Sequence, residues 1–255
     1  MKPALANGRN RRTFADPGPD FPHFGLGRRV LYIRRDLAAR ATAIFGALAQ
    51  LNRRATSGAG NRGSGFPLKL EGGGPVLFAR WGRRGGLVGL INSDIYFGGG
   101  ARPLRELTIA NEARLRGIPI AEPLGAVIEA VAPGFYRSAF ITRALSGMTL
   151  WELLRADDDA VVRAHVVELA RRAIDTMHDA GLLHADLNLH NLFISNSGER
   201  MTAVILDLDK AQLFNGPVPA AQRQTNFARL ARSARKLDPD LRYLDKKSHA
   251  ILTVS

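Results

Sequence analysis

The chain has 255 residues, with 36 Lys and Arg against 23 Asp and Glu, which gives a formal net charge of +13. Its length and composition exclude a collagen-like, coiled-coil or wholly disordered protein and allow one large domain or two small lobes. The absence of cysteine excludes a disulfide framework and a thiol nucleophile, and no apolar run approaches the roughly 18 residues of a membrane span. These features favour a cytosolic protein, and the excess of positive charge favours a polyanionic partner.

The first 56 residues are basic and predict two segments. Residues 1–33 mix Arg, Pro and Gly, which predicts a flexible basic arm. Residues 34–56 predict an amphipathic helix, because apolar residues recur at spacings of three and four: Leu37, Ala41, Ile44, Phe45, Leu48 and Leu51. The arginines that flank this apolar stripe are Arg34, Arg35, Arg40, Arg53 and Arg54. Such a helix either lies on an anionic membrane surface or packs on the neighbouring lobe with its arginines in water, and the sequence leaves both open.

Residues 57–146 predict a small lobe of strands with one helix. Strands are expected over residues 66–70, 75–81, 126–131 and 138–144, and a helix is expected over residues 103–116. Gly58, Gly60 and Gly63 fit the pattern G-x-G-x-x-G. Because a strand rather than a helix follows them, they predict a flap folded over phosphates instead of a Rossmann turn.

Residues 147–255 predict a compact and mostly helical lobe. Helices are expected over residues 149–154, 159–180 and 224–237. Between the last two lie a polar loop and a small hairpin, for which residues 192–194 and 204–206 are the expected strands. A polar tail is expected to close the chain.

The polar loop holds the strongest catalytic pattern, His184-Ala185-Asp186-Leu187-Asn188-Leu189-His190-Asn191, and Asp207 follows the hairpin. This His-x-Asp-x4-Asn pattern matches the catalytic and metal-binding segments of protein-kinase-like folds. Asp186 is the candidate base for a substrate hydroxyl, and His184 is expected to shape the loop. Asn191 and Asp207 are the candidate Mg²⁺ ligands, because Mg²⁺ requires hard oxygen atoms. The alternative, two unrelated polar loops, requires the spacing, the preceding helix and the strand before Asp207 to coincide by chance.

A kinase-like lobe also needs a cation that meets the nucleotide phosphates. Arg80, near the end of a predicted strand, is the first candidate and Lys69 is the second. The carboxylate that would pair with this cation is expected on the following helix. Glu106 is favoured because Ile109, Ala110 and Ala113 share its face, whereas Glu112 is placed for an exposed pair with Arg116.

The chain resembles the Kdo kinase and lipopolysaccharide kinase family over about residues 57–237. The resemblance is carried by the catalytic loop and by segments on both sides of it: residues 79–88, 94–97, 102–106, 117–123, 207–210 and 226–233. It implies an α+β, protein-kinase-like fold of two lobes, in which a small antiparallel-sheet N-lobe with one helix precedes a mostly helical C-lobe.

The same resemblance implies an ATP- and Mg²⁺-dependent transfer of phosphate to the 4-hydroxyl of Kdo on a lipid A precursor. Asp186 would be the catalytic base, and Asn191 and Asp207 the metal ligands. Such an enzyme would work in the cytoplasm as a peripheral protein on the anionic inner face of the inner membrane, and no obligate protein partner is evident.

Other functions fit the same catalytic loop. An aminoglycoside-like or other small-molecule phosphotransferase, and an atypical Ser/Thr kinase, share the chemistry. The short stretch after Asp207 disfavours a protein acceptor, because it has no room for the long activation segment of protein kinases. A basic pseudokinase that binds membranes or nucleic acid is a further alternative, but the scarcity of aromatic residues disfavours nucleic acid as a partner.

Overall fold

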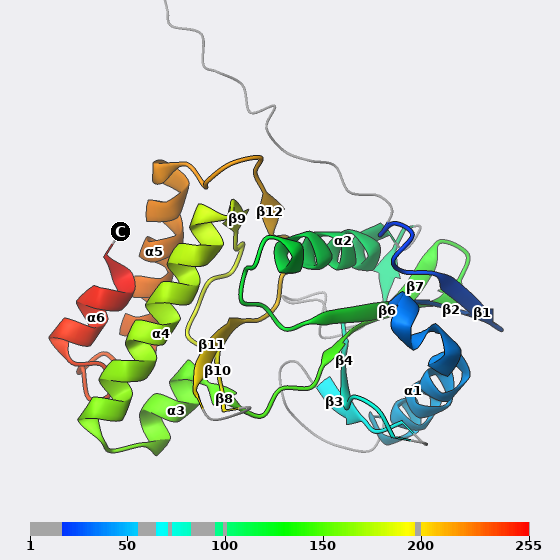
Figure 1. Cartoon of the computed structure of the whole chain (residues 1–255), viewed down its shortest axis with the longest axis horizontal. Coiled ribbons are helices and arrows are strands. Elements are labelled where there is room, and N and C mark those ends of the chain that lie inside the picture. Colours follow the sequence, from blue (N-terminus) through cyan, green and yellow to red (C-terminus); the bar gives the residue numbers. More distant parts are fainter. Residues whose placement is uncertain are drawn as a thin grey trace, which may run out of the picture. The chain divides into compact units, whose positions relative to one another are not determined.

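The computed structural model describes residues 17–55, 65–70, 73–82, 95–98, 101–196 and 200–254. The chain forms two compact units (Figure 1). The N-terminal unit contains the described residues up to Asn111 together with Ala121–Ala144, and the C-terminal unit contains Glu112–Ile120 and the described residues from Leu145 onwards. Each unit is described by itself.

The N-terminal unit is built on an antiparallel sheet. Its strands are β1 (His23–Leu26), β2 (Arg29–Ile33), β3 (Gly65–Leu68), β4 (Leu77–Trp81), β5 (Tyr96–Phe97), β6 (Pro123–Ala132) and β7 (Phe135–Arg143). The strand order is β1-β2-β6-β7-β4-β3, and β5 pairs with β7 beside this path. On either side of the central β6–β7 pair, β2 places Leu31 opposite Val127 of β6, and β4 places Ala79 opposite Ile141 of β7.

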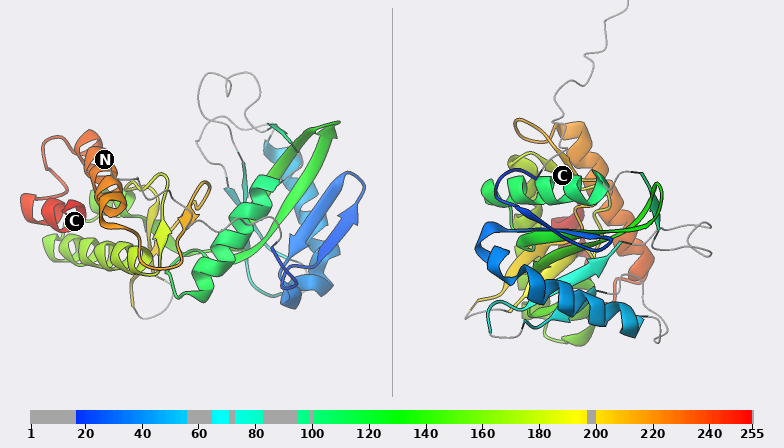
Figure 2. Two further views of the ribbon diagram at one scale, coloured as in Figure 1. Left: turned by 90° about the horizontal axis from the view of Figure 1, so that it is seen from above. Right: turned by 90° about the vertical axis from the view of Figure 1, so that its right-hand side faces the viewer.

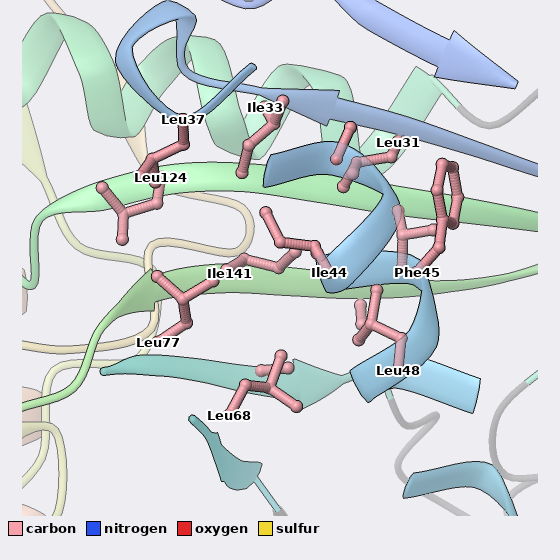
Figure 3. Close-up of a cluster of buried hydrophobic side chains, with 14 of the residues drawn as sticks. Leu31, Ile33, Leu37, Ile44, Phe45, Leu48, Leu68, Leu77, Leu124 and Ile141 are labelled. Carbon is pink, nitrogen blue, oxygen red and sulfur yellow. The ribbon is translucent and has the colours of Figure 1, made fainter. Parts of the chain in front are cut away.

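Helices cover both faces of this sheet because its strands alternate side chains between the faces. Leu31 and Ile33 of β2 point into the main core beneath α1 (Ala41–Ala55), as Figure 3 shows. Tyr32 between them packs on the other face, near Leu107 of α2 (Ala101–Leu115). The two helices therefore lie on opposite sides of the sheet, as Figure 1 also shows.

The expectation of a flexible arm over residues 1–33 is wrong for its described part. Residues 23–33 form the β1–β2 hairpin, which pairs with β6 at the side of the sheet. Leu31 and Ile33 are fully buried, and these two inward-facing residues fix the face that β2 turns to the main core. Residues 1–16 lie outside the described part of the chain.

The helix expected over residues 34–56 forms, and its apolar stripe packs on the sheet. It begins as a 3-10 helix, η1 (Arg35–Arg40), and continues as α1. The stripe residues Leu37, Ala41, Ile44, Phe45 and Leu48 are buried in the main core. This contradicts the membrane-surface alternative for the stripe, because these side chains already have an apolar partner. Of the flanking arginines, Arg34 pairs with Asp36 at 2.7 Å and also with Glu122.

The C-terminal unit is mostly helical, with two short sheets at one side (Figure 2). Its elements are β8 (Gly147–Thr149), α3 (Leu150–Ala156), α4 (Ala160–Asp179), β9 (Leu182–Leu183), β10 (Leu192–Ser195), β11 (Thr202–Ile205), β12 (Gln212–Leu213), α5 (Ala220–Leu237) and α6 (Lys246–Thr253). Strands β11, β10 and β8 form one sheet, β12 pairs with β9, and α6 packs against both α4 and α5. None of the helices in the described residues is long and apolar enough to cross a membrane.

The polar tail expected after residue 237 instead contains helix α6. The buried carboxylate of Asp238 accepts hydrogen bonds from the backbone N–H groups of Arg242, Tyr243 and Leu244 at 2.7–2.9 Å, which fixes the turn after α5. Asp245 then caps α6 by accepting from the Ser248 N–H at 2.6 Å. Because Leu252 is the one fully buried apolar side chain of α6, its hydrophobic pattern is too short to predict the helix.

A short segment between α2 and β6 belongs to the C-terminal unit. Arg116 Nη1 donates to the backbone carbonyls of Ala180 at 2.9 Å and Phe214 at 2.7 Å. Ile120 forms a parallel bridge with Ile205, and the Ile205 N–H donates to the Pro119 carbonyl at 2.8 Å. These bonds join the segment to β11 and to the ends of α4 and β12.

Candidate active site

The β10–β11 hairpin brings Asn191 and Asp207 to the same end of a two-stranded ladder. Leu192 pairs with Ile205, so Asn191 directly precedes the ladder and Leu206 directly follows it. The Leu206 N–H donates to the Asn191 carbonyl at 2.9 Å. Asp207 is the next residue, and the two candidate metal ligands are therefore held close along the backbone.

His184 joins this hairpin to the catalytic loop. It is fully buried, its Nδ1 accepts from the Asp186 N–H at 3.0 Å, and its Nε2 lies 2.9 Å from the Leu206 carbonyl. Because Nδ1 is an acceptor, the proton of the neutral ring sits on Nε2 and is donated to Leu206. Burial lowers the pKa of His184, and the hydrogen bond to Leu206 opposes this shift only in part. The neutral imidazole thus positions Asp186 and the residue before Asp207 together.

Asn188 and Asn191 hold the remaining turn of the loop. Asn188 Oδ1 accepts from the N–H groups of His190 at 2.9 Å and Asn191 at 3.2 Å. The Asp186 carbonyl accepts from the side-chain amides of Asn188 at 2.9 Å and Asn191 at 2.8 Å. Sequence reasoning did not assign Asn188 a role, although an asparagine that bonds backbone N–H groups two and three residues ahead is a common turn signal.

The two candidate carboxylates are exposed, while their neighbours are buried. Asp186 and Asp207 face solvent, whereas Leu187, Leu189 and Leu208 beside them are buried. Asp207 has a φ of 59°, in the left-handed region, and Lys210 has a φ of 66°. A non-glycine residue in this conformation costs roughly 1–2 kcal/mol, least for Asp and Asn. The buried leucines and the hydrogen bonds at Leu206 stabilise this sharp turn and so direct the Asp207 carboxylate.

Hydrogen-bonded side chains from α4 and α5, most of them buried, support the loop. Asn226 of α5 donates through Nδ2 to the His184 carbonyl at 2.8 Å, and its Oδ1 lies 3.1 Å from Nε2 of His178 on α4. Burial lowers the pKa of His178, and no group among the described residues bonds its Nδ1. Both facts fit a neutral ring that donates from Nε2. Seven residues along α5, Ser233 Oγ accepts from the Leu189 N–H at 3.5 Å.

The N-terminal unit forms the expected charge pair. Arg80 of β4 and Glu106 of α2 meet at 2.9 Å, and the Glu106 side chain is only 10% exposed. Glu112, the rejected alternative, pairs with Arg116 at 3.0 Å, and Lys69 is exposed. The structure therefore pairs Arg80 with Glu106 as predicted, and its contact with phosphates stays a prediction. The glycine pattern at Gly58, Gly60 and Gly63 lies outside the described residues.

The donor set suits Mg²⁺ better than zinc. Among the described residues there is no cluster of three or more His, Cys, Asp or Glu side chains, so a closed protein site of that kind is not formed. Asn191 directs its amide nitrogen to the loop, and its Oδ1 and the Asp207 carboxylate are hard oxygen donors. Two such protein ligands fit an ion whose shell is completed by nucleotide phosphates and water.

These elements define a protein-kinase-like phosphotransferase. The likeness to a solved structure agrees with this fold: "WaaP in complex with acyl carrier protein" matches with a TM-score of 0.52 and 14% identity, and the match covers 87% of this chain and 86% of that chain.

The family is shown by sequence. Residues 76–251 match the model of the lipopolysaccharide kinase (Kdo/WaaP) family. The 3-deoxy-D-manno-octulosonic acid kinase of Xylella fastidiosa (strain M23) is 34% identical over 184 residues, which cover 70% of this chain and 68% of that protein. The kinase of the same name from Stenotrophomonas maltophilia (strain R551-3) is 31% identical over 220 residues, covering 84% and 82%. The chain belongs to the lipopolysaccharide kinase (Kdo/WaaP) family and is a phosphotransferase that acts on a sugar hydroxyl.

Proposed function

We propose that this chain transfers the γ-phosphoryl group of ATP to the 4-hydroxyl of Kdo on a lipid A precursor. The observation that carries the proposal is the double hydrogen bonding of Leu206 to His184 and Asn191, which joins the loop of Asp186 to the turn of Asp207. Relatives with 31–34% identity that are named 3-deoxy-D-manno-octulosonic acid kinase support the acceptor.

Asp186 is the group that orients the acceptor hydroxyl and accepts its proton. As the hydroxyl oxygen bonds to the γ-phosphorus, the bond from phosphorus to the β,γ-bridging oxygen breaks and ADP leaves. Asn191 and Asp207 would hold Mg²⁺, which when bound neutralises charge on the phosphate oxygens. The exposed position of Asp186 leaves it open to a large, lipid-linked acceptor.

Arg80 is the residue we assign to the ATP phosphates, with Glu106 as the group that holds its guanidinium in place. The nearly buried Glu106 carboxylate fixes one edge of the guanidinium, and a planar guanidinium can bind a second anion at another edge. Gly58, Gly60 and Gly63 are assigned to the phosphate flap on the sequence pattern alone.

The proposed site of action is the cytoplasmic face of the inner membrane, where ATP and a lipid A precursor are both accessible. The net charge of +13 supports attraction to anionic lipid. Sedimentation with anionic vesicles tests this: binding should weaken as salt rises from 0.01 to 0.1 M and the Debye length falls from about 30 to about 10 Å. Binding that does not depend on salt, or no binding at low salt, contradicts a peripheral electrostatic attachment.

The decisive experiment is phosphate transfer by purified protein. ATP consumption should require both Mg²⁺ and a Kdo-bearing lipid A precursor, and mass spectrometry should find one added phosphate on the Kdo. The precursor without Kdo and an aminoglycoside are the matched negative acceptors. Turnover with the aminoglycoside but not with the Kdo acceptor would replace the proposal with the small-molecule phosphotransferase alternative.

A further inference from the structure

Helix α5 carries more positive charge than the carboxylates among the described residues pair with. Its 18 residues contain Arg223, Arg229, Arg232, Arg235 and Lys236 and no Asp or Glu. Arg223 pairs with Asp179 at 2.7 Å. The other four cations form no ion pair with any residue that the structure describes. Like charges three and four residues apart on a helix repel each other, so this arrangement disfavours the helix unless an anion binds there.

One of these cations, Arg229, lies on the side of α5 that meets the catalytic loop, and Lys236 and Arg232 follow it around the helix. Asn226 and Ser233 mark that side, because they bond the loop at His184 and Leu189. At 100° per residue, Arg229 lies within about 60° of both, whereas Lys236 and Arg232 lie about 80° and about 120° from Asn226, progressively further from the loop contacts. We call Arg229, Arg232 and Lys236 the α5 basic stripe. Arg235 points about half a turn away from Asn226, outside the stripe.

Arg229 is the member of the α5 basic stripe that lies closest, by angle around the helix, to the two residues that bond the catalytic loop. It is half-buried, whereas Arg232 and Lys236 are exposed. Its charge and that of Asp186 both act on the imidazole of His184, with opposite effects on the pKa of that ring. The two hydrogen bonds between α5 and the loop, at 2.8 and 3.5 Å, hold Arg229 in place relative to the loop that carries Asp186.

We propose that Arg229 binds the carboxylate of the acceptor sugar, and that Arg232 and Lys236 extend the positive surface along the bound glycolipid. The inference rests on the proposed function, because the acceptor is then a sugar acid that carries a carboxylate and the reacting hydroxyl on one residue. The group that binds the carboxylate must therefore lie close to the base that binds the hydroxyl. A guanidinium binds a carboxylate through two parallel hydrogen bonds, which also orients the sugar.

The test compares two charge-removing variants of one helix on two acceptors. Arg229→Gln should raise the KM for the Kdo-bearing acceptor about tenfold or more and leave the KM for ATP unchanged, because a charge-assisted bidentate pair is lost. Arg235→Gln removes the same charge from the opposite side of α5 and should leave both constants unchanged. The second acceptor is the same glycolipid with its Kdo carboxyl group methylated. The KM of wild type should be about tenfold higher for this ester than for the acid. The KM of Arg229→Gln should be the same for the acid and the ester.

The outcomes separate this inference from the proposed function. If wild type transfers no phosphate to the Kdo acceptor, the proposed function fails. If wild type is active but handles acid and ester equally, the carboxylate is not bound and the inference is overturned, whatever the stability of the variants. A rise in the KM for ATP in Arg229→Gln would assign Arg229 to the nucleotide instead. Equal effects of Arg229→Gln and Arg235→Gln would indicate only a general attraction of anionic lipid to the helix.

Discussion

Three oxygen-bearing side chains of the C-terminal unit differ in what surrounds them, and this separates their roles. Asp186 is exposed and its backbone is held by His184 and by two asparagine amides. Asn191 has its nitrogen engaged in the loop, and this leaves its oxygen to face another group. Asp207 sits at a left-handed backbone turn. An exposed carboxylate on a fixed backbone suits a base, while an amide oxygen beside a carboxylate suits a divalent ion.

The first prediction concerns the base. Asp186→Asn keeps the size of the side chain but removes the charge that orients and accepts the hydroxyl proton, so turnover should fall on the order of 10²–10⁴. ATP affinity, measured by calorimetry, should stay close to that of wild type because the proposed metal ligands are unchanged. A variant that turns over at the wild-type rate would show that the segment His184–Asn191 is not a catalytic loop.

The second prediction concerns the metal. Asp207→Asn is the suitable change, because asparagine tolerates the left-handed φ of 59° at this position. The loss of a charged ligand should raise the Mg²⁺ concentration needed for half-maximal activity, and unfolding by urea should stay close to wild type. Asp240→Asn, an exposed carboxylate after α5, is the control. An unchanged Mg²⁺ requirement in Asp207→Asn would contradict the assignment.

Among the secondary-structure elements, α5 is the support of the site. Its Asn226 connects α4 to the catalytic loop through His178 and His184, and each of these three side chains is buried. Inside a protein, leaving a polar group unpaired costs more free energy than a formed hydrogen bond contributes. This row of hydrogen-bonded side chains therefore stabilises one arrangement of the loop.

The third prediction tests this support. Asn226→Ala leaves the His178 Nε2–H and the His184 carbonyl without their partner, and should lower the free energy of unfolding by about 1–3 kcal/mol. The kcat should fall as well, because the backbone of Asp186 loses its anchor through His184, while the KM for ATP should change little. Gln224→Ala, at an exposed position of the same helix, should change neither quantity. If Asn226→Ala matches Gln224→Ala, this row of hydrogen-bonded side chains does not position the loop.

The sequence could predict the elements in which apolar residues repeat over many positions or in which functional residues stand at a fixed spacing. Helix α4, the β10–β11 hairpin and the Arg80–Glu106 pair follow from apolar repeats and from residues on a shared face. The β1–β2 hairpin and α6 were missed because few inward-facing residues fix each one, and their partners are distant in the chain. The contact of Asn226 with His184 spans 42 residues, so no local pattern could have shown it.

For the whole molecule, the buried histidines couple stability to pH. The pKa values of His178 and His184 in the folded protein are lowered, chiefly by burial, below the value near 6.5 that histidine has in an unfolded chain. The unfolded chain therefore binds more protons as pH falls through this value. The stabilisation that comes from keeping these two histidines neutral in the folded protein is complete above about pH 6.5. It is lost as the pH decreases towards their pKa values in the folded state.

The fourth prediction follows from the direction of this pH dependence. The free energy of unfolding should decrease below about pH 6.5, with a slope of up to about 1.4 kcal/mol per pH unit for each histidine. Urea titrations from pH 8 to pH 5 measure it. His178→Gln should reduce the slope, whereas His190→Gln, at an exposed position of the loop, should leave it as in wild type. A stability that is constant across this range would contradict the account.

The segment Glu112–Ile120 has a consequence for the order in which the chain can fold during synthesis. It leaves the ribosome before Ala180, Ile205 and Phe214, the residues that its backbone and Arg116 bond. Residues 121–144, which complete the N-terminal sheet, are made in the interval. The segment Glu112–Ile120 therefore cannot complete its contacts in the C-terminal unit until synthesis has passed Phe214, whereas the N-terminal sheet can close once residue 144 has been made. If the chain were cut at residue 145, the fragment that begins there would lack Ile120, which pairs with Ile205 of β11.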